Sequence, residues 1–161
     1  MIMKNLIIIG AGQYGQVTKE AAEAMGCYGK ISFLDDNNPQ AIGKISDYEK
    51  FIDEYECAVV AIGNSDVRLS LIEKLDSVGY EIVTIIHPMA YISPHARIGK
   101  GCIIEANVTV NTDAVLGMGV IVSANAVVNH NSVVEKGCHI DVGAVVPSNE
   151  TILEGTKVTL I

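Results

Sequence analysis

The chain has 161 residues; 49% are hydrophobic, only two are Phe and none is Trp, so aliphatic side chains must build its core. A formal net charge of −8 argues against a nucleic-acid-binding protein, because phosphate contacts require clustered Lys and Arg. The apolar runs, such as residues 6–9, are far too short to cross a bilayer, and the first four residues lack the regions of a secretory signal. We therefore expect a cytoplasmic protein without membrane insertion.

The N-terminal half alternates predicted strands and helices. We predict a strand over Met3–Ile9, because its continuous apolar part, residues 6–9, is typical of a strand buried on both faces of a parallel sheet. A GxGxxG motif formed by Gly10, Gly12 and Gly15 follows, and then a helical sequence to about Met25. The further elements that we predict are strands at 31–34, 57–62 and 82–86, a short helix at 48–54, and a helix capped by residues 63–65 that runs to about residue 78.

These elements form a small Rossmann-like βαβαβ unit. Its glycines let the backbone approach a phosphate at a helix N-terminus, and Asp35, about twenty residues beyond Gly15, suits a ribose hydroxyl. A dinucleotide needs two such halves, whereas about 85 residues here supply only one. The unit's size therefore disfavours NAD and favours a mononucleotide or a nucleotide sugar.

Residues 92–158 repeat with a period of six, which neither a helix nor a half-buried strand explains. The fifth position of each hexad is mostly small, and the fourth is rich in Gly, Asn and Asp, which turn a chain. The pattern predicts a parallel β-helix with three hexads in each triangular coil. The first position is aliphatic in all twelve hexads: Ile92, Ile98, Ile104, Val110, Leu116, Val122, Val128, Val134, Ile140, Val146, Ile152 and Val158.

The four cysteines fit no metal-ligand spacing, so no metal site is expected. Cys102 and Cys138 both occupy the small inward position, two coils apart on one face. A spacing of about 4.8 Å per coil places them about 10 Å apart, too far for a disulfide. We interpret both as core residues.

This combination resembles the bacterial sugar acyltransferases, which include sialic-acid O-acetyltransferases and UDP-amino-sugar N-acetyltransferases. The resemblance covers the whole chain and implies a Rossmann-like α/β domain over residues 1–87, followed by an all-β, left-handed β-helix domain over residues 88–161. The segments that carry it are 10–15 (GAGQYG), 33–36 (FLDD), 61–64 (AIGN), 86–88 (IHP), 92–94 (ISP), 127–131 (VVNHN) and 137–139 (GCH).

The resemblance implies acetyl transfer from acetyl-CoA to an amine or hydroxyl of a free or nucleotide-linked sugar, in surface-glycan biosynthesis. It implies a homotrimer with active sites between adjacent β-helices, with His130 as general base and His139 near the cofactor thioester. The residue pattern agrees for His130, because it occupies an outward hexad position and a neutral imidazole accepts a proton near pH 7. The substrate-binding positions carried over are Gly10, Gly12, Gln13, Tyr14, Asp35, Asp36, Gly63 and Asn64.

Three departures from the family pattern leave questions open. Asn131 stands where the family has an acidic residue; its amide orients the ring but cannot stabilise an imidazolium as a carboxylate does. Tyr14 stands where amino-sugar acetyltransferases often have His, which leaves the acceptor open. Family chains also continue past the position of Lys157, so we expect an incomplete β-helix domain and a donor site that depends on further coils.

Two other functions compete with acetyl transfer. A nucleotide-sugar binding or scaffolding protein that has lost catalysis is the main alternative. An NAD-dependent oxidoreductase rests only on the glycine motif and Asp35 and lacks the second nucleotide-binding half.

Overall fold

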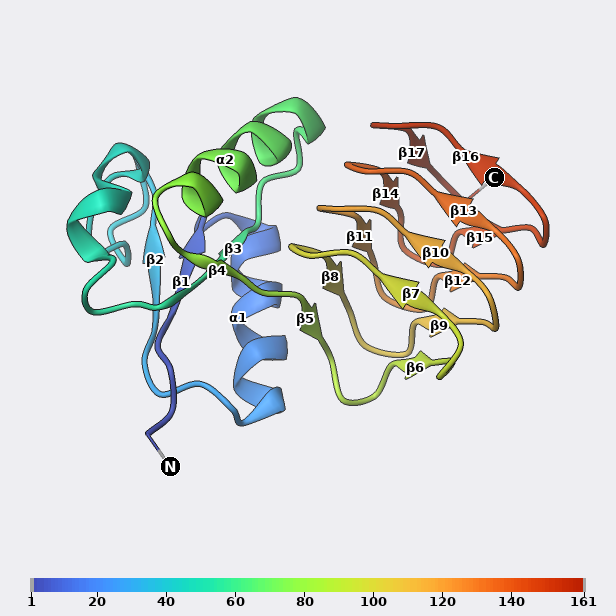
Figure 1. The fold of residues 1–161 in the computed structure, drawn as a ribbon, viewed down its shortest axis with the longest axis horizontal. Helices are drawn as coiled ribbons and strands as arrows, with labels where there is room; N and C mark the ends of the chain where they lie inside the picture. Colours follow the sequence, from blue (N-terminus) through green and yellow to red (C-terminus); the bar gives the residue numbers. More distant parts are fainter. Residues whose placement is uncertain (1, 161) are drawn as a thin grey trace.

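A computed structural model describes residues 2–160 as two parts side by side, an α/β part and a triangular column of short strands (Figure 1). The α/β part holds a parallel sheet in the order β2-β1-β3-β4. Every residue of β1 and β3 is buried, as the continuous apolar runs predict. The strands are β1 (Leu6–Ile9), β2 (Ile31–Leu34), β3 (Cys57–Val60) and β4 (Glu81–Ile82).

Two α-helices and a 3₁₀ helix complete this part: α1 (Gln13–Met25), η1 (Ile45–Phe51) and α2 (Ser65–Ser77). The ends of α1 and α2 are as predicted: α1 stops at Gly26, whose φ of 64° suits glycine, and the side chain of Asn64 caps α2. The prediction of a short helix at 48–54 is wrong at both ends. The helix η1 starts at Ile45, because the Asp47 carboxylate accepts the N–H of Lys44 and closes the first turn earlier, and it ends at Phe51.

The column is a parallel β-helix of two-residue strands with three faces, and the predicted hexad register is confirmed. The covered face is β5-β8-β11-β14-β17, the second face β6-β9-β12-β15 and the third face β7-β10-β13-β16. The aliphatic first position of each hexad points into one core that also holds the free cysteines Cys102 and Cys138. The strands are β5 (Ile85–Ile86), β6 (Tyr91–Ile92), β7 (Arg97–Ile98), β8 (Ile103–Ile104), β9 (Thr109–Val110), β10 (Val115–Leu116), β11 (Ile121–Val122), β12 (Val127–Val128), β13 (Val133–Val134), β14 (His139–Ile140), β15 (Val145–Val146), β16 (Thr151–Ile152) and β17 (Lys157–Val158).

The predicted strand at 82–86 is two strands that belong to different sheets. Val83 still donates its N–H to Ala58 of β3, but Ile85 donates to Cys102 of the β-helix. Between them the Thr84 hydroxyl donates to the carbonyl of Gly99 at 2.8 Å and accepts the N–H of Cys102 at 3.2 Å. The chain therefore passes from one sheet to the other within this apolar run.

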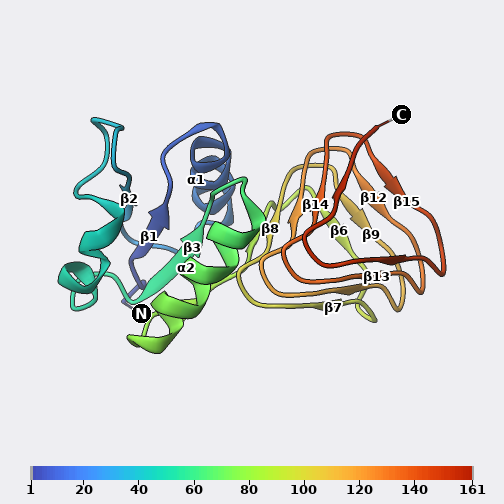
Figure 2. The same cartoon turned by 90° about the horizontal axis from the view of Figure 1, so that it is seen from above.

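The two parts share a hydrophobic core. Helix α1 packs on β5, and Ile103 and Ile121 of the covered face lie in one buried cluster with Phe33 and Ala21 of the α/β part. Seen from above, the α/β part lies along this one side of the triangle, and the second and third faces remain free (Figure 2). This packing fixes the glycine loop against the β-helix.

Candidate active site

The glycine loop between β1 and α1 leaves the helix N-terminus open. A side chain at Gly15 would stand 2.1 Å from the carbonyl oxygen of Gly10, and Gly10 itself has a φ of 97°. These two glycines therefore make the turn possible. Gly12 is the N-cap of α1, and a Cβ there would meet no atom within 4 Å. With the exposed Gln13 beside it, Gly12 leaves backbone N–H groups accessible, which is the arrangement that binds phosphate.

The carboxylate of Asp35 hydrogen-bonds to the glycine loop and to the residues that follow Asp35 itself. Its Oδ2 accepts the N–H of Ala11 at 2.8 Å, and its Oδ1 accepts those of Asn37 and Asn38 at 2.9 and 2.8 Å. These hydrogen bonds, that from Ala11 foremost, lower the pKa of Asp35. The predicted ribose contact would add to a carboxylate that already accepts three N–H groups.

A hollow lies beside Asp36, between η1 and α2 at the carboxyl ends of β2 and β3. Two adjoining depressions of about 490 and 510 Å³ share Asp36, Ile45, Leu71 and Lys74, and Ile62 adds to the apolar wall. Asp36 accepts the N–H of Ile45 through one oxygen at 3.0 Å. Ligands of open α/β sheets bind at this edge.

Tyr14 joins the glycine loop to the β-helix. Its ring meets that of His139 edge to face at 5.4 Å, and it covers Gly63, where a Cβ would lie 3.1 Å from Cε2 of Tyr14. His139 is 5% exposed, and its Nε2 lies 2.9 Å from Oγ of Ser123. Burial lowers the pKa of His139, so the ring is neutral at pH 7. The structure therefore brings the predicted cofactor residue against the predicted substrate loop.

His130 and Asn131 lie elsewhere, on the exposed far corner formed by residues 129–132 between β12 and β13. The corners between the second and third faces are the edge of the triangle farthest from the α/β part (Figure 2). Nδ1 of His130 lies 3.1 Å from Nδ2 of Asn131, and the His130 N–H donates to Oδ1 of Asn129 at 2.9 Å. The chain thus does not bring its own His130 to its own glycine loop.

Arg68 was missed by the sequence analysis. This fully buried side chain of α2 donates to the carbonyls of Ile62 (2.6 Å), Gly63 (3.0 Å), Gly119 (2.7 Å) and Gly137 (2.7 Å). It bonds loop β3–α2 to two turns of the β-helix. The sequence could have indicated that Arg68 is buried, because it lies at helical spacing from Ile72 and Leu75 on the apolar side of α2.

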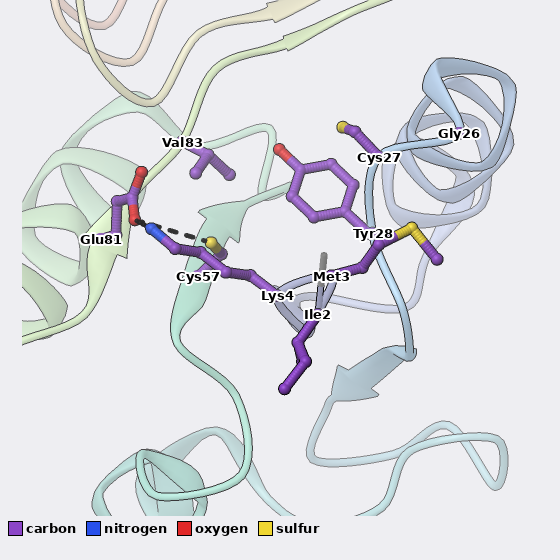
Figure 3. Close-up of a pocket in the computed structure, with 9 residues that line it drawn as sticks. All are labelled: Ile2, Met3, Lys4, Gly26, Cys27, Tyr28, Cys57, Glu81 and Val83. Atoms are coloured by element: carbon purple, nitrogen blue, oxygen red, sulfur yellow. Dashed lines mark hydrogen bonds and ion pairs between the residues drawn. The ribbon is translucent and has the colours of Figure 1, made fainter.

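Another cavity, of about 510 Å³, lies at the opposite edge of the sheet (Figure 3). Lys4 precedes β1, whereas Cys57 and Glu81 begin β3 and β4, so the cavity opens at the amino ends of the strands. Lys4 and Glu81 form an ion pair across it. We do not assign the nucleotide to this cavity.

Within residues 2–160, no cluster of three or more His, Cys, Asp or Glu side chains could hold a metal ion. None of the helices described there is long and apolar enough to cross a membrane.

Comparisons with known proteins agree with this fold. Residues 5–75 match the family model of the PglD N-terminal domain. The chain is 31% identical to UDP-N-acetylbacillosamine N-acetyltransferase of Bacillus subtilis and 30% identical to GDP-perosamine N-acetyltransferase of Escherichia coli O157:H7. These matches cover 65% and 66% of the chain but 52% and 53% of the relatives, so the chain spans about half the length of the curated relatives it matches.

Solved structures extend the likeness over both parts. The acetyltransferase domain of PglB from Neisseria gonorrhoeae, in complex with acetyl coenzyme A, is 35% identical, with a TM-score of 0.91 over 97% of this chain and 79% of that one. A mutant of perosamine N-acetyltransferase from Caulobacter crescentus, in complex with CoA and GDP-perosamine, has the same fold at 24% identity and a TM-score of 0.91 over 97% and 77% of the two chains. The fold is thus that of the sugar acetyltransferases. The chain belongs to the family of PglD-like and PglB-like sugar acetyltransferases, which confirms the resemblance seen in the sequence.

Proposed function

We propose that this chain transfers the acetyl group of acetyl-CoA to the amine of a nucleotide-linked amino sugar. The observation that carries the proposal is the contact of Tyr14 with His139, which sets a phosphate-binding loop against the β-helix. The relatives whose names state their reaction are N-acetyltransferases of UDP- or GDP-linked sugars, which favours an amine over a hydroxyl acceptor. Residues 1–87 would hold the nucleotide and residues 88–161 would support the transfer.

The nucleotide would lie along the carboxyl edge of the sheet. Its phosphates would meet the open N-terminus of α1 at Gly12 and Gln13, and its base would enter the hollow beside Asp36. Gly63 lets the ring of Tyr14 lie close to the backbone, so the passage from the nucleotide to the β-helix would be narrow there. Asn64 would serve the site by capping the N-terminus of α2. The sugar would then point toward His139.

The chemistry needs one proton acceptor. The amine nitrogen attacks the thioester carbonyl and forms the carbon–nitrogen bond, and its proton goes to Nε2 of His130. The carbon–sulfur bond breaks, CoA leaves as the thiolate, and that thiolate takes up the proton to leave as the thiol. Nε2 of His130 can accept the proton only if the ring hydrogen is on Nδ1. The side-chain oxygen of Asn131 must then face Nδ1 and accept that hydrogen. The two ends of an amide are alike in shape, so the 3.1 Å contact allows that orientation.

The far position of His130 implies a site shared between chains. We propose a homotrimer in which the far corner of one β-helix meets the glycine loop of its neighbour. The second and third faces carry exposed apolar side chains suited to such an interface: Tyr91 is 56% exposed, Val145 53% and Val133 37%. Light scattering that gives a monomer at micromolar concentration would contradict this assembly.

The test is acetylation of UDP- and GDP-linked amino sugars, with the acetylated sugar quantified by mass spectrometry. His130→Asn should lower kcat about 10²–10⁴-fold, the usual worth of a general base. His95→Asn is the matched control, since His95 is also exposed on the β-helix. A loss below tenfold would move the base elsewhere. Nucleotide-sugar binding without acetylation would favour the scaffolding alternative.

A further inference from the structure

A column of polar side chains runs along the corner that leads from the covered face to the second face. Glu105, Ser123 and Asp141 occupy the same position in three successive coils, each directly after a strand of the covered face. His139 stands beside this column and meets it at Ser123. The aliphatic residues that directly precede the column, Ile104, Val122 and Ile140, are all in the core of the β-helix.

Glu105 is a buried carboxylate without a cation. It is 9% exposed, and it forms no ion pair within the part of the chain that the structure describes. Its Oε2 accepts the N–H of Ala124 at 2.8 Å. Burial raises the pKa of Glu105, while the hydrogen bond from the Ala124 N–H and the neighbouring Ser123 hydroxyl act in the opposite direction. Those two donors therefore favour the ionised form.

Ser123 lies between Glu105 and His139: it stands one coil beyond Glu105 at the same position, and its Oγ lies 2.9 Å from Nε2 of His139. Its hydroxyl has one hydrogen to give and can accept others. A carboxylate accepts that hydrogen more strongly than a neutral imidazole does. With the hydrogen directed to Glu105, the Ser123 oxygen can only accept, and the 2.9 Å contact must then be donated by Nε2 of His139.

We propose that Glu105, acting through Ser123, is a positioning residue that keeps His139 in the tautomer with hydrogen on Nε2 and a lone pair on Nδ1. Nδ1 makes no hydrogen bond within residues 2–160. It is therefore available to an N–H or O–H donor of a ligand at the junction with Tyr14. Only this use by a ligand rests on the proposed function; the tautomer itself does not.

Other charged groups around His139 do not replace this arrangement. Oδ1 of Asp141 lies 3.8 Å from Nε2, but that carboxylate already accepts from Lys157 at 3.0 Å and from the N–H of Val142 at 3.0 Å. Burial lowers the pKa of His139, and the positive charges of Lys157 and Arg68 add to this effect, so the ring is neutral. Tyr14 covers the ring from the α/β part. A neutral ring has two tautomers, and Ser123 offers the close partner that selects one.

The test is ¹⁵N NMR of histidine-labelled protein without ligand at pH 7, which distinguishes a bare from a hydrogen-bearing ring nitrogen. Wild type should show His139 with hydrogen on Nε2. In Glu105→Gln the amide oxygen can keep the Ala124 N–H, and its NH₂ group then donates to Ser123. The serine hydrogen turns to Nε2, so His139 should change to the Nδ1–H tautomer.

Glu135→Gln is the matched control, because Oε2 of Glu135 accepts the N–H of Glu154 at 2.8 Å in the same way at another corner. It should leave the His139 signals unchanged. A wild-type ring with hydrogen on Nδ1 would overturn the proposal, even if the Glu105 variant did not fold. So would a folded Glu105→Gln protein that keeps Nε2–H. Because no turnover is measured, either result is separate from a failure of acetyl transfer.

Discussion

Arg68 should be the most costly single side chain to remove at the junction of the two parts. It is fully buried and meets four carbonyls, two on loop β3–α2 and two on turns of the β-helix. Burial lowers the pKa of this guanidinium, and its charge meets carbonyl dipoles instead of a carboxylate. We choose Arg68→Met, which keeps the apolar stem and removes every donor.

The expected loss follows from those four bonds. A hydrogen bond to a charged group contributes about 1.5–3 kcal/mol, and each buried polar group left without a partner costs about 1–3 kcal/mol. The bonds share one side chain and do not add, and the variant removes the charge itself, so we expect the cost of one or two unpartnered buried carbonyls, about 2–5 kcal/mol. Domains are stable by about 5–15 kcal/mol, so the variant should fold but with a large part of its stability lost.

The assay is urea unfolding followed by circular dichroism, with hydrogen exchange to report each part separately. Wild type should unfold in one transition, whereas Arg68→Met should unfold earlier and its α/β part should exchange before the β-helix. Lys74→Met, an exposed change on the same helix, should stay within about 0.5 kcal/mol of wild type. A loss below about 1 kcal/mol for Arg68→Met would refute the reasoning.

Two further predictions concern the glycine loop. Gly15→Ala should lower the melting temperature sharply, because its methyl group would stand 2.1 Å from a carbonyl oxygen. Gly12→Asp should keep the wild-type melting temperature, since Asp is a preferred N-cap. The same variant should abolish nucleotide-sugar binding, because its carboxylate repels phosphate. Equal melting temperatures for the two variants would contradict this. Asp35 has a folded pKa below its unfolded value of 3.8, so its stabilising contribution is present above that pH and is lost as the pH falls through the folded pKa. The stability gap between wild type and Asp35→Asn should therefore close below about pH 4, and a gap independent of pH would contradict the role of Asp35.

The β-helix was predictable because each coil repeats one physical requirement. A two-residue strand must send one aliphatic side chain inward and a turn must follow, so register and core could be read directly from the hexads. The break at Val83–Thr84 could not be predicted, because isoleucines flank it on both sides and the residues that pair with the two strands, Ala58 and Cys102, are distant in sequence. Local pattern does not encode which sheet an apolar residue joins.

The sequence allowed candidate site residues to be named, but it did not indicate which of them lie next to one another. Nothing in the sequence indicated that Tyr14 would meet His139 while His130 lies on the opposite corner, because that depends on how α1 docks on the covered face. Glu105 was missed for a related reason: it occupies an ordinary hexad position, and its significance comes from burial beside Ser123. Tertiary packing, rather than local pattern, made these residues a site.

The most direct test of the shared active site is complementation between two inactive variants. His130→Asn lacks the base and Gly12→Asp lacks nucleotide binding, so each alone should fail to acetylate the sugar. When the two are co-expressed with different tags and the trimers that contain both are purified, one of the three sites in each trimer should combine an intact far corner with a neighbour's intact glycine loop. We expect acetylation to return to roughly that fraction of wild type. A mixed assembly no more active than either variant would contradict the account.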